Sequence, residues 1–428
     1  MTTIRDQARS WAEANWDPEM TVAQWWECLF EARYCLPSLP EEAFGRGYSR
    51  QEENESRHGL RDAGTLGPAV GISTMMAAPT IAAHGTPEQI ERYIPPMLTG
   101  QESWCQLFSE PGAGSDLAGL QTSASRDGDI WTINGQKVWT SLAAGTDYGM
   151  LIARSDRDKP KHAGITWFAF PMRQAGVDIR PLVEMTGQAF FNEVFMDDAV
   201  VGHDAVIGAV NDGWRVANTT LMHERASLAG SGVMLPFASA GRDSPDLDKP
   251  AGSFSYYRFE TRNSGSNEAK RLPTAVWYHQ ISTELGLATA ERLDVRMRLY
   301  ISEEVNRMLG LRARQGTVPA VGNLGKLAMS EIARMRREVG NQSIGAAGML
   351  SGADANAGPG KGDIQRKTLH SPAPAIYGGT DQVQRNIIGE RFLGLPKEPA
   401  PPPDTPFKGL WGVNVWRGRR KERWYEGG

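Results

Sequence analysis

A glycine-rich segment, SEPGAGSD at residues 109–116, has the residue types that could surround a phosphate group or a flat ring. Closely spaced glycines let a backbone approach such a group, and their N–H groups can bind anions. The segment does not match the dinucleotide-binding fingerprint, because Leu117 replaces its third glycine. It does not match the P-loop, because Leu120 stands where the lysine belongs. By itself, a tight surface turn explains the segment better than a ligand site does.

A second segment, IYGGTDQVQRNII at residues 376–388, has the pattern of a helix start. Gly378 and Gly379 precede Thr380, a good N-cap residue, and Asp381 follows where the helix dipole favours a carboxylate. The backbone N–H groups of such a start could hold a polar ligand edge or a phosphate. An ordinary loop-to-helix junction has the same residues, and on the local sequence alone it is the better explanation.

A third segment, LMHERASLAG at residues 221–230, places Glu224 in an otherwise small and apolar helical stretch. Burial would raise the pKa of this carboxyl group, which could then act as a general base. The alternative is a structural ion pair between Glu224 and a nearby arginine. The local sequence alone favours this alternative.

Helices are expected in the first hundred residues, which precede the glycine-rich segment. Thr86 can cap a helix, Pro87 suits its first position, and Gln89 completes a capping box. We expect this helix to stop before Pro95, because proline restricts the residue that precedes it.

Between about residues 104 and 201 the pattern becomes short, alternating and rich in turns. The runs 129–133 and 136–140 flank Asn134-Gly135, which predicts a hairpin. Residues 165–170 and 193–196 predict further strands. Because no helical segment separates them, an antiparallel sheet or barrel is expected rather than a parallel one.

Helical periodicity returns near Trp214. Apolar residues share one helix face in 293–309 and again in 324–339, which predicts long bundle helices. Residues 238–272 lack such a period and are rich in Gly, Ser, Asp and Asn, so we expect a long loop or a disordered insertion. The tail from Pro399 ends in a basic and aromatic stretch that could touch RNA or anionic lipid, but a solvated tail is the favoured interpretation.

The composition is that of an ordinary globular protein and excludes several classes of function. With 428 residues, two or three packed units are expected, and 46 basic against 50 acidic residues give a net charge of −4. No basic excess points to nucleic acid or a membrane surface, and no run of about 18 apolar residues predicts a membrane span. The charged first residues differ from a signal peptide. Three cysteines without a CxxC pair predict no disulfide framework and no metal site, and a cytoplasmic location is expected.

The three segments, in this order along a helix–β–helix chain, resemble the acyl-CoA dehydrogenase family. SEPGAGSDLAGLQTSA followed by WTINGQKVWTS is similar to its flavin and acyl-CoA signature, and YGGTDQVQRNIIGERFLGLPKEP to its C-terminal signature. The likeness covers roughly 5–236 and 285–398. It implies an α+β multi-domain fold with these parts: an N-terminal α-helical domain (1–103), a middle antiparallel β-barrel or sandwich (104–210), a C-terminal four-helix bundle (211–398) and a tail (399–428).

The resemblance also implies FAD as the cofactor, bound between the β unit and the C-terminal helices. Matching positions lie along the flavin (Phe108, Ser109, Trp139, Ser141), at the FAD phosphate and adenosine (Thr380, Gln382), at the FAD of a neighbouring subunit (Gln342, Gly345) and at the substrate (Ser115, Arg225). Ser109 and Ser141 replace frequent threonines and keep the hydroxyl group.

The position of the catalytic base separates branches of this family. Most members place a Glu directly before Gly-Thr in the C-terminal signature, where this chain has Gly378, which cannot accept a proton. Branches resembling isovaleryl- and long-chain acyl-CoA dehydrogenases carry the base on the earlier helix, just before an arginine, and Glu224-Arg225 matches that arrangement. The resemblance therefore implies Glu224 as the base, with the Gly378 N–H helping to hold the thioester oxygen.

The implied reaction is α,β-dehydrogenation of an acyl-CoA to a trans-2-enoyl-CoA. Glu224 would remove the α-proton while a hydride leaves the β-carbon for flavin N5, and an electron-transfer flavoprotein would take the electrons. The family further implies a homo- or heterotetramer active in lipid catabolism. The residues leave the acyl chain open between long, branched and ring-bearing groups.

The chain departs from the family at the 238–272 insertion. Many members have there an Arg and a Phe that reach the neighbouring FAD, followed by a Gln; Lys270 or Arg271 with Gln280 is the nearest match, and no Phe falls in place. Two alternatives to the dehydrogenase therefore stay open. One is a non-catalytic or half-site subunit of a heterotetramer, and the other is a flavin oxidase on the same scaffold.

Overall fold

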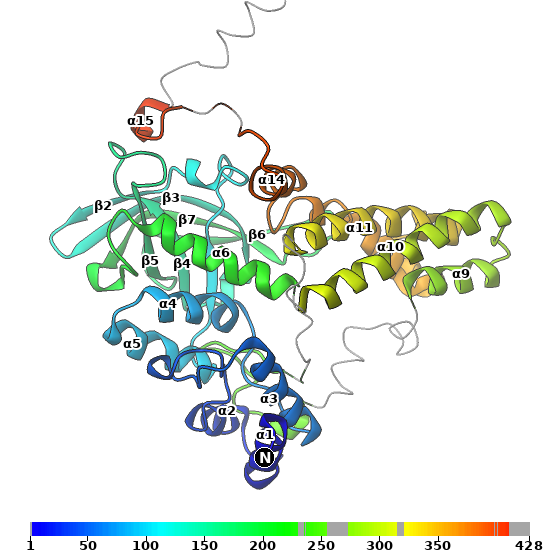
Figure 1. The fold of residues 1–428 in the computed structure, drawn as a ribbon, viewed down its shortest axis with the longest axis horizontal. Coiled ribbons are helices and arrows are strands. Elements are labelled where there is room, and N and C mark those ends of the chain that lie inside the picture. Colours follow the sequence, from blue (N-terminus) through cyan, green and yellow to red (C-terminus); the bar gives the residue numbers. More distant parts are fainter. Residues whose placement is uncertain are drawn as a thin grey trace, which may run out of the picture.

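The chain folds as N-terminal helices, a curled β-sheet in the middle and C-terminal helices that extend to one side (Figure 1). The structure is a computed structural model, and it describes residues 2–229, 235, 237–254, 273–314, 321–397, 399 and 401–410. The predicted α+β class is confirmed. The predicted boundaries after residues 103, 210 and 398 stay predictions.

The N-terminal helices begin with side-chain caps that local sequence encodes. Thr21 and Ser49 form capping boxes with Gln24 and Glu52, as the pattern at Thr86 predicts for its own helix. The helices are α1 (Ile4–Asn15), α2 (Val22–Glu31), α3 (Arg50–Asp62), the π-helical η2 (Ser73–Ala77), α4 (Ala78–His84) and α5 (Pro87–Leu98).

Helix α5 continues through Pro95 and Pro96 to Leu98, so the predicted stop before Pro95 is wrong. Each proline removes one helical hydrogen bond. The carbonyl of Pro95 still accepts a bond from the Thr99 N–H at 3.0 Å, and Ile94 and Leu98 are completely buried. Burial of these side chains, about 1.5–3 kcal/mol each, offsets the loss at the prolines.

Within the described residues, seven strands form one mixed sheet in the order β1-β4-β2-β3-β7-β6, with β5 also paired to β4. The strands are β1 (Trp104–Leu107), β2 (Ser123–Asp127), β3 (Ile130–Ser141), β4 (Tyr148–Arg154), β5 (Ile165–Pro171), β6 (Val177–Leu182) and β7 (Phe191–Gly202). Most pairs are antiparallel, as predicted, whereas β1 lies parallel to β4. The strands expected at 165–170 and 193–196 are confirmed within β5 and β7.

The predicted hairpin at Asn134-Gly135 is wrong, because β3 runs straight through both residues. The Asn134 side chain exchanges two hydrogen bonds of 2.9 Å with Asp198 on β7 instead of closing a turn. Gly135 lies so close to Thr122 that a Cβ atom would come within 2.4 Å of its Oγ1. The glycine therefore allows a close approach of backbones, and the turn between β2 and β3 falls at residues 128–129.

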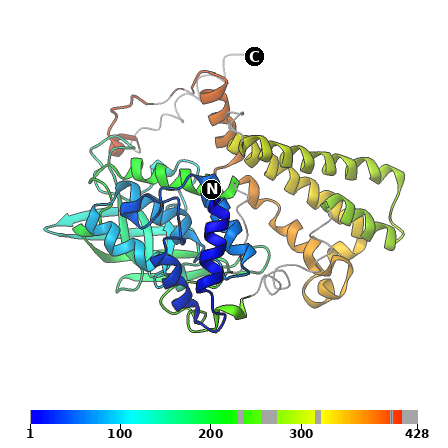
Figure 2. The same cartoon turned by 60° about the horizontal axis from the view of Figure 1, so that its bottom comes forward.

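Helix α6 (Gly213–Ala229) lies against the sheet, whereas α9 (Thr274–Glu284), α10 (Ala290–Arg314), α11 (Val321–Ile344) and α13 (Asp363–His370) form an arm that extends away from it (Figures 1 and 2). The other C-terminal helices are α12 (Gly352–Ala357) and α14 (Asp381–Ile387). The helices predicted at 293–309 and 324–339 are confirmed within α10 and α11. Much of the apolar face predicted for α10 is exposed, however, because the arm buries the side of α10 that carries Leu299.

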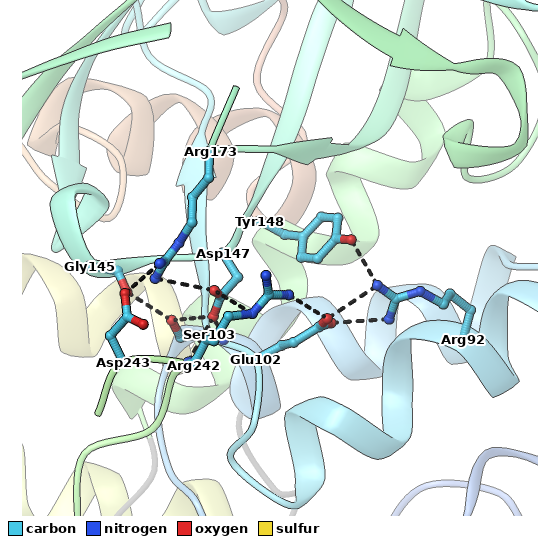
Figure 3. Close-up of polar contacts among 9 residues, drawn as sticks. All are labelled: Arg92, Glu102, Ser103, Gly145, Asp147, Tyr148, Arg173, Arg242 and Asp243. Atoms are coloured by element: carbon cyan, nitrogen blue, oxygen red, sulfur yellow. Dashed lines mark hydrogen bonds and ion pairs between the residues drawn. The ribbon is translucent and has the colours of Figure 1, made fainter. Parts of the chain in front are cut away.

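The described part of the insertion, residues 238–254, is an irregular loop that packs against the N-terminal helices and the sheet. Its Lys249 carbonyl accepts a 2.9 Å hydrogen bond from the Val22 N–H. Figure 3 shows Arg242 of this loop between Glu102 and Asp147, two buried carboxylates that Arg92 and Arg173 also contact. The predicted loop is thus confirmed for 238–254, and residues 255–272 lie outside the described residues, Lys270 and Arg271 included.

The tail is not entirely solvated, which corrects the favoured interpretation. Its short helix α15 (Phe407–Leu410) begins with a completely buried phenylalanine. The basic stretch at 416–425 lies outside the described residues.

Candidate active site

The end of β1 and the second half of β3 lie side by side and bring two of the sequence-predicted segments together. The Val138 N–H donates a 2.9 Å hydrogen bond to the Ser109 carbonyl. Phe108 is buried, whereas Ser109 and Ser141 are half-buried. The four residues predicted along the flavin, Phe108, Ser109, Trp139 and Ser141, therefore belong to one edge of the β unit.

A β-bulge between Lys137 and Thr140 re-aims the side chains at this edge. Trp139 has φ 60° and Leu142 has φ 57°, a left-handed conformation that costs a large side chain about 1–3 kcal/mol. Both side chains are nevertheless more than half exposed, at 56% and 58%. Two strained and exposed apolar residues on either side of Ser141 indicate a surface shaped for a ligand.

A buried ion pair holds the glycine-rich segment against this edge. Lys137 is completely buried, and its Nζ donates to the Phe108 carbonyl at 3.0 Å and to Glu110 at 2.9 Å. Burial pushes the pKa of Glu110 upward, but Lys137 and hydrogen bonds from Thr122 and Gln121 outweigh it and lower the pKa. The Glu110 carboxylate is therefore ionised. It binds the backbone N–H groups of Gln121 and Thr122 directly and the Phe108 carbonyl through Lys137.

Glu224 lies on α6 beside the same edge. Gln106 of β1, two residues before Phe108, donates a 3.4 Å hydrogen bond to its Oε2. Burial raises the pKa of Glu224, and the Gln106 bond and the neighbouring Arg225 lower it only in part. In the described part of the chain Glu224 makes no ion pair. The geometry therefore favours a carboxyl group available for proton transfer over one held in a structural ion pair.

The arginine that follows the glutamate is exposed as a residue. Burial of part of the Arg225 side chain and the nearby charge of Arg391 lower its pKa. Neither arginine has an ion pair among the described residues, so together they leave a local excess of positive charge beside Glu224.

The second glycine segment forms a tight turn before α14. Gly378 and Gly379 have φ 63° and 82°, and Thr380 caps the helix by accepting the Val383 N–H at 3.2 Å, as predicted. Gln384 Nε2 donates to the Gly378 carbonyl at 2.8 Å and closes the turn. The Gly378 carbonyl thus accepts a hydrogen bond from within the turn.

Asp381 fixes the turn to the arm, because Lys326 and Arg334 of α11 contact its buried carboxylate at 3.3 and 2.5 Å. Burial would raise the pKa of Asp381, but Ser330 and these two cations outweigh that effect and lower it. Across the turn, Ser115 donates a 3.4 Å hydrogen bond to Thr380 and so joins the two glycine segments. Gln382 is exposed on the first turn of α14.

Gln342 and Gly345 lie apart from the other predicted site residues. Helix α11 has 24 residues and is about 36 Å long, and its first turns, not its last, contact α14. The Gln342 carbonyl instead accepts a bond from Arg292 at 3.0 Å. Within one chain these two residues therefore lie at the far end of the arm.

Sequence reasoning missed Gln106, Lys137 and Glu110 as parts of the site. Gln106 and Phe108 have the strand spacing that places both on one face, and Lys137 interrupts an apolar inward-facing pattern. These signals were present in the sequence, but a lone Lys or Gln in a strand also fits a solvated face.

Comparison with known proteins identifies the family. Residues 2–101 match the family model for the acyl-CoA dehydrogenase N-terminal domain, and residues 105–199 match the one for its middle domain. The chain is 35% identical over 375 residues to acyl-CoA dehydrogenase IpdE1 of Mycobacterium tuberculosis, which covers 87% of this chain and 88% of the relative. It is also 37% identical over 358 residues to acyl-CoA dehydrogenase FadE34 of the same organism, covering 83% of this chain and 44% of that relative.

The chain thus belongs to the acyl-CoA dehydrogenase family, whose members are flavoprotein oxidoreductases. It spans less than half the length of FadE34, which has further sequence of its own. Among solved structures, the ChsE4-ChsE5 complex from Mycobacterium tuberculosis has the same fold, with a TM-score of 0.60, 24% identity and coverage of 92% of this chain and 97% of the other.

None of the helices in the described part of the chain combines the length and the apolar character that crossing a membrane requires. Among the described residues, no group of three or more His, Cys, Asp or Glu side chains could hold a metal ion.

Proposed function

We propose that this protein is an FAD-dependent acyl-CoA dehydrogenase that uses Glu224 as its base. The observation that carries the proposal is the environment of Glu224. It is a carboxyl group of raised pKa that has no ion pair within the described residues, on a helix that faces the strand leading into Phe108 and Ser109. A structural glutamate would instead be expected to pair with a cation.

The residues at the β edge suit a flat, polar-rimmed ring system such as the isoalloxazine of FAD. Among the described residues the hydroxyl groups of Ser109 and Ser141 have no side-chain hydrogen-bond partner, so both are free for a ligand. Trp139 would cover one side of the ring and exclude water, and Thr380 and Gln382 would hold the phosphate and adenosine parts. FAD, when bound, supplies the acceptor for the hydride that leaves the substrate.

The proposed chemistry of the protein itself rests on two groups. The Gly378 N–H would bind the thioester oxygen, which acidifies the α-carbon, and Glu224 would then take the α-proton. Glycine at position 378 suits this, because the turn needs φ 63° and leaves only a backbone donor there. Ser115 and Arg225 would contact the substrate. The charges of Arg225 and Arg391, which have no ion pair in the part of the chain that the structure describes, favour an anionic ligand such as coenzyme A.

The arm supports the proposal of an oligomer. Six apolar side chains follow one face of α10, and each is about half exposed: Leu293, Met297, Ile301, Val305, Met308 and Leu311. We call this face the α10 stripe. A second chain packed on it would also bring a copy of Gln342 and Gly345 toward a neighbouring flavin. An electron-transfer flavoprotein would reoxidise the enzyme.

The proposal is tested with purified protein and a panel of long, branched and ring-bearing acyl-CoA thioesters. We expect a chain that retains flavin absorbance and reduces an artificial electron acceptor with at least one thioester. A flavin-containing protein that turns over none of the thioesters would contradict the proposal.

The same panel separates the two alternatives. A colourless chain that gains flavin only when co-expressed with a related chain would support a half-site subunit, which the complex formed by ChsE4 and ChsE5 makes a specific possibility. Stoichiometric peroxide during turnover, without need of an added acceptor, would support an oxidase.

A further inference from the structure

The C-terminal segment 405–409, which we call the clasp, is anchored to the loop between β4 and β5. The Phe407 N–H donates to the Lys159 carbonyl at 2.9 Å, and the Lys408 N–H donates to the Arg157 carbonyl at 3.0 Å. Pro406 forms a β-bridge with Pro160. The clasp therefore holds a defined place on the β unit, although neither family model that matches the chain extends to it.

The anchor of the clasp is the ring of Phe407, which is completely buried against Arg154 at the end of β4. The guanidinium carbon of Arg154 lies 3.7 Å from the centre of that ring, a close cation–π contact. Burial lowers the pKa of Arg154 to about 10, so this side chain stays charged at neutral pH. In the described residues it makes no ion pair, and the ring face is thus one of few groups that compensate its charge.

Arg154 links the clasp to the turn that follows the glycine-rich segment. Its NH2 donates to the Ala118 carbonyl at 2.6 Å, and its NH1 donates to the Lys161 carbonyl at 2.7 Å. Lys161 in turn pairs with Asp116 at 2.5 Å. One guanidinium thereby binds the turn at 116–119, directly after Ser115, through Ala118 itself and indirectly through Lys161.

We propose that the clasp is a positioning element for the substrate loop: Phe407 orients Arg154, and Arg154 fixes the turn at 116–119 that sets the place of Ser115. The link to substrate rests on the proposed function, in which Ser115 contacts the acyl-CoA. The link from the clasp to the turn does not depend on it. Removal of the ring would loosen the turn and weaken substrate binding while leaving Glu224 and the flavin edge intact.

The test compares Phe407→Ala, Phe407→Leu and Arg154→Lys with the wild type in the full-length protein. Phe407→Leu keeps apolar volume but removes the ring face, and lysine cannot reach both carbonyls. Lys408→Ala is the matched control, because this side chain is on the same clasp but exposed and paired only with Asp158. Hydrogen exchange of peptides spanning 115–121 is measured without substrate, and KM and kcat are measured with the best thioester.

We expect all three variants, but not Lys408→Ala, to speed exchange in 115–121 about tenfold and to raise KM by a similar factor, with kcat changed less than about twofold. The Phe407→Leu/Arg154→Lys double variant should exchange no faster than either single variant, because both break one path. The proposed role of the clasp would be overturned by unchanged exchange in Phe407→Leu and Arg154→Lys. It would also be overturned if the double variant exchanged as fast as the sum of the two single effects predicts. Faster exchange with an unchanged KM would overturn the substrate link, and a wild type without acyl-CoA turnover would refute the proposed function alone.

Discussion

The two halves of this molecule differ in how completely they bury their own apolar residues. The N-terminal helices and the sheet share one continuous core, in which Trp25, Trp26 and Phe168 are completely buried. The arm of α9–α11 and α13 has a separate small core around Leu299 and Val339, and it exposes the α10 stripe. The first half has one large core of its own, and we call it the complete half. The arm instead exposes a continuous apolar face, which is typical of an element that packs on another chain.

The same contrast divides the candidate site. Phe108, Ser109 and Trp139 belong to the half that is complete in itself, and Glu224 lies where α6 crosses it. Gln342 and Gly345 lie at the far end of the arm. A single chain therefore brings together the proposed base and flavin edge, whereas the residues proposed for a neighbouring FAD lie apart from them.

The largest expected effect separates chemistry from cofactor binding in the complete half. Glu224→Gln keeps the size of the side chain and the Gln106 contact but cannot accept a proton, so we expect turnover to fall about 10²–10⁴-fold. Flavin content should stay unchanged, because among the described residues Glu224 makes no hydrogen bond or ion pair to the residues proposed along the flavin. Steady-state assays on protein of known flavin content check this, and turnover within threefold of wild type would remove Glu224 from the mechanism.

The next effect tests whether the arm needs a partner. Ile301→Glu places a charge in the middle of the α10 stripe, and burying it at an interface should weaken assembly about 100-fold or more. Val200→Glu is the matched control, since Val200 is similarly exposed, at 49% against 54% for Ile301, but lies on β7. Sedimentation over a range of concentrations measures both. An equal change in assembly for Ile301→Glu and Val200→Glu would show that the arm is not the surface that packs on another chain.

A smaller effect tests the shared core of the complete half. A Cβ at Gly100 would come within 2.1 Å of the Trp26 ring, and φ is +70° there, whereas Gly47 has φ +65° with open space around it. Both alanine variants carry left-handed strain of about 1–2 kcal/mol. Gly100→Ala should lose roughly 1–3 kcal/mol more in the free energy of unfolding, through overpacking. Thermal unfolding should show one lowered transition for helices and sheet together, and separate transitions would show that the core is not shared.

The smallest expected effect is a shift in the pH dependence of kcat/KM. Because burial raises the pKa of Glu224 and a base must be deprotonated, kcat/KM should rise with pH through a value above that of an ordinary glutamate. Gln106→Leu removes the hydrogen bond that favours the ionised form, so the acid limb should move further upward. An acid limb at the ordinary glutamate pKa in both proteins would contradict the buried environment.

Features encoded by neighbouring residues were predictable from the sequence. The capping box at Thr86 and the N-cap at Thr380 involve side chains only three positions away, and the long helices followed from periodicity. The Asn134-Gly135 hairpin failed because the partner of Asn134 is Asp198, on a strand 64 residues further along. The continuation of α5 through Pro95 depended in the same way on distant packing.

The candidate site shows the same limit. The family resemblance supplied positions such as Ser109 and Glu224, but it could not supply their surroundings. The buried pair of Lys137 and Glu110, and the contact of Phe407 with Arg154, join residues that only the fold brings together. Charge and burial at these points are tertiary properties. A single-sequence pattern such as the lone lysine at position 137 does not show which partner it has.

The central claim is that Glu224 takes the α-proton of an acyl-CoA, and isotope exchange measures this step alone. The protein is incubated in D₂O with an acyl-CoA analogue that has sulfur at the β-position, so that no hydride can leave. The account predicts that deuterium enters the α-carbon with the wild-type protein and not with Glu224→Gln of equal flavin content. Equal exchange in both proteins would contradict it.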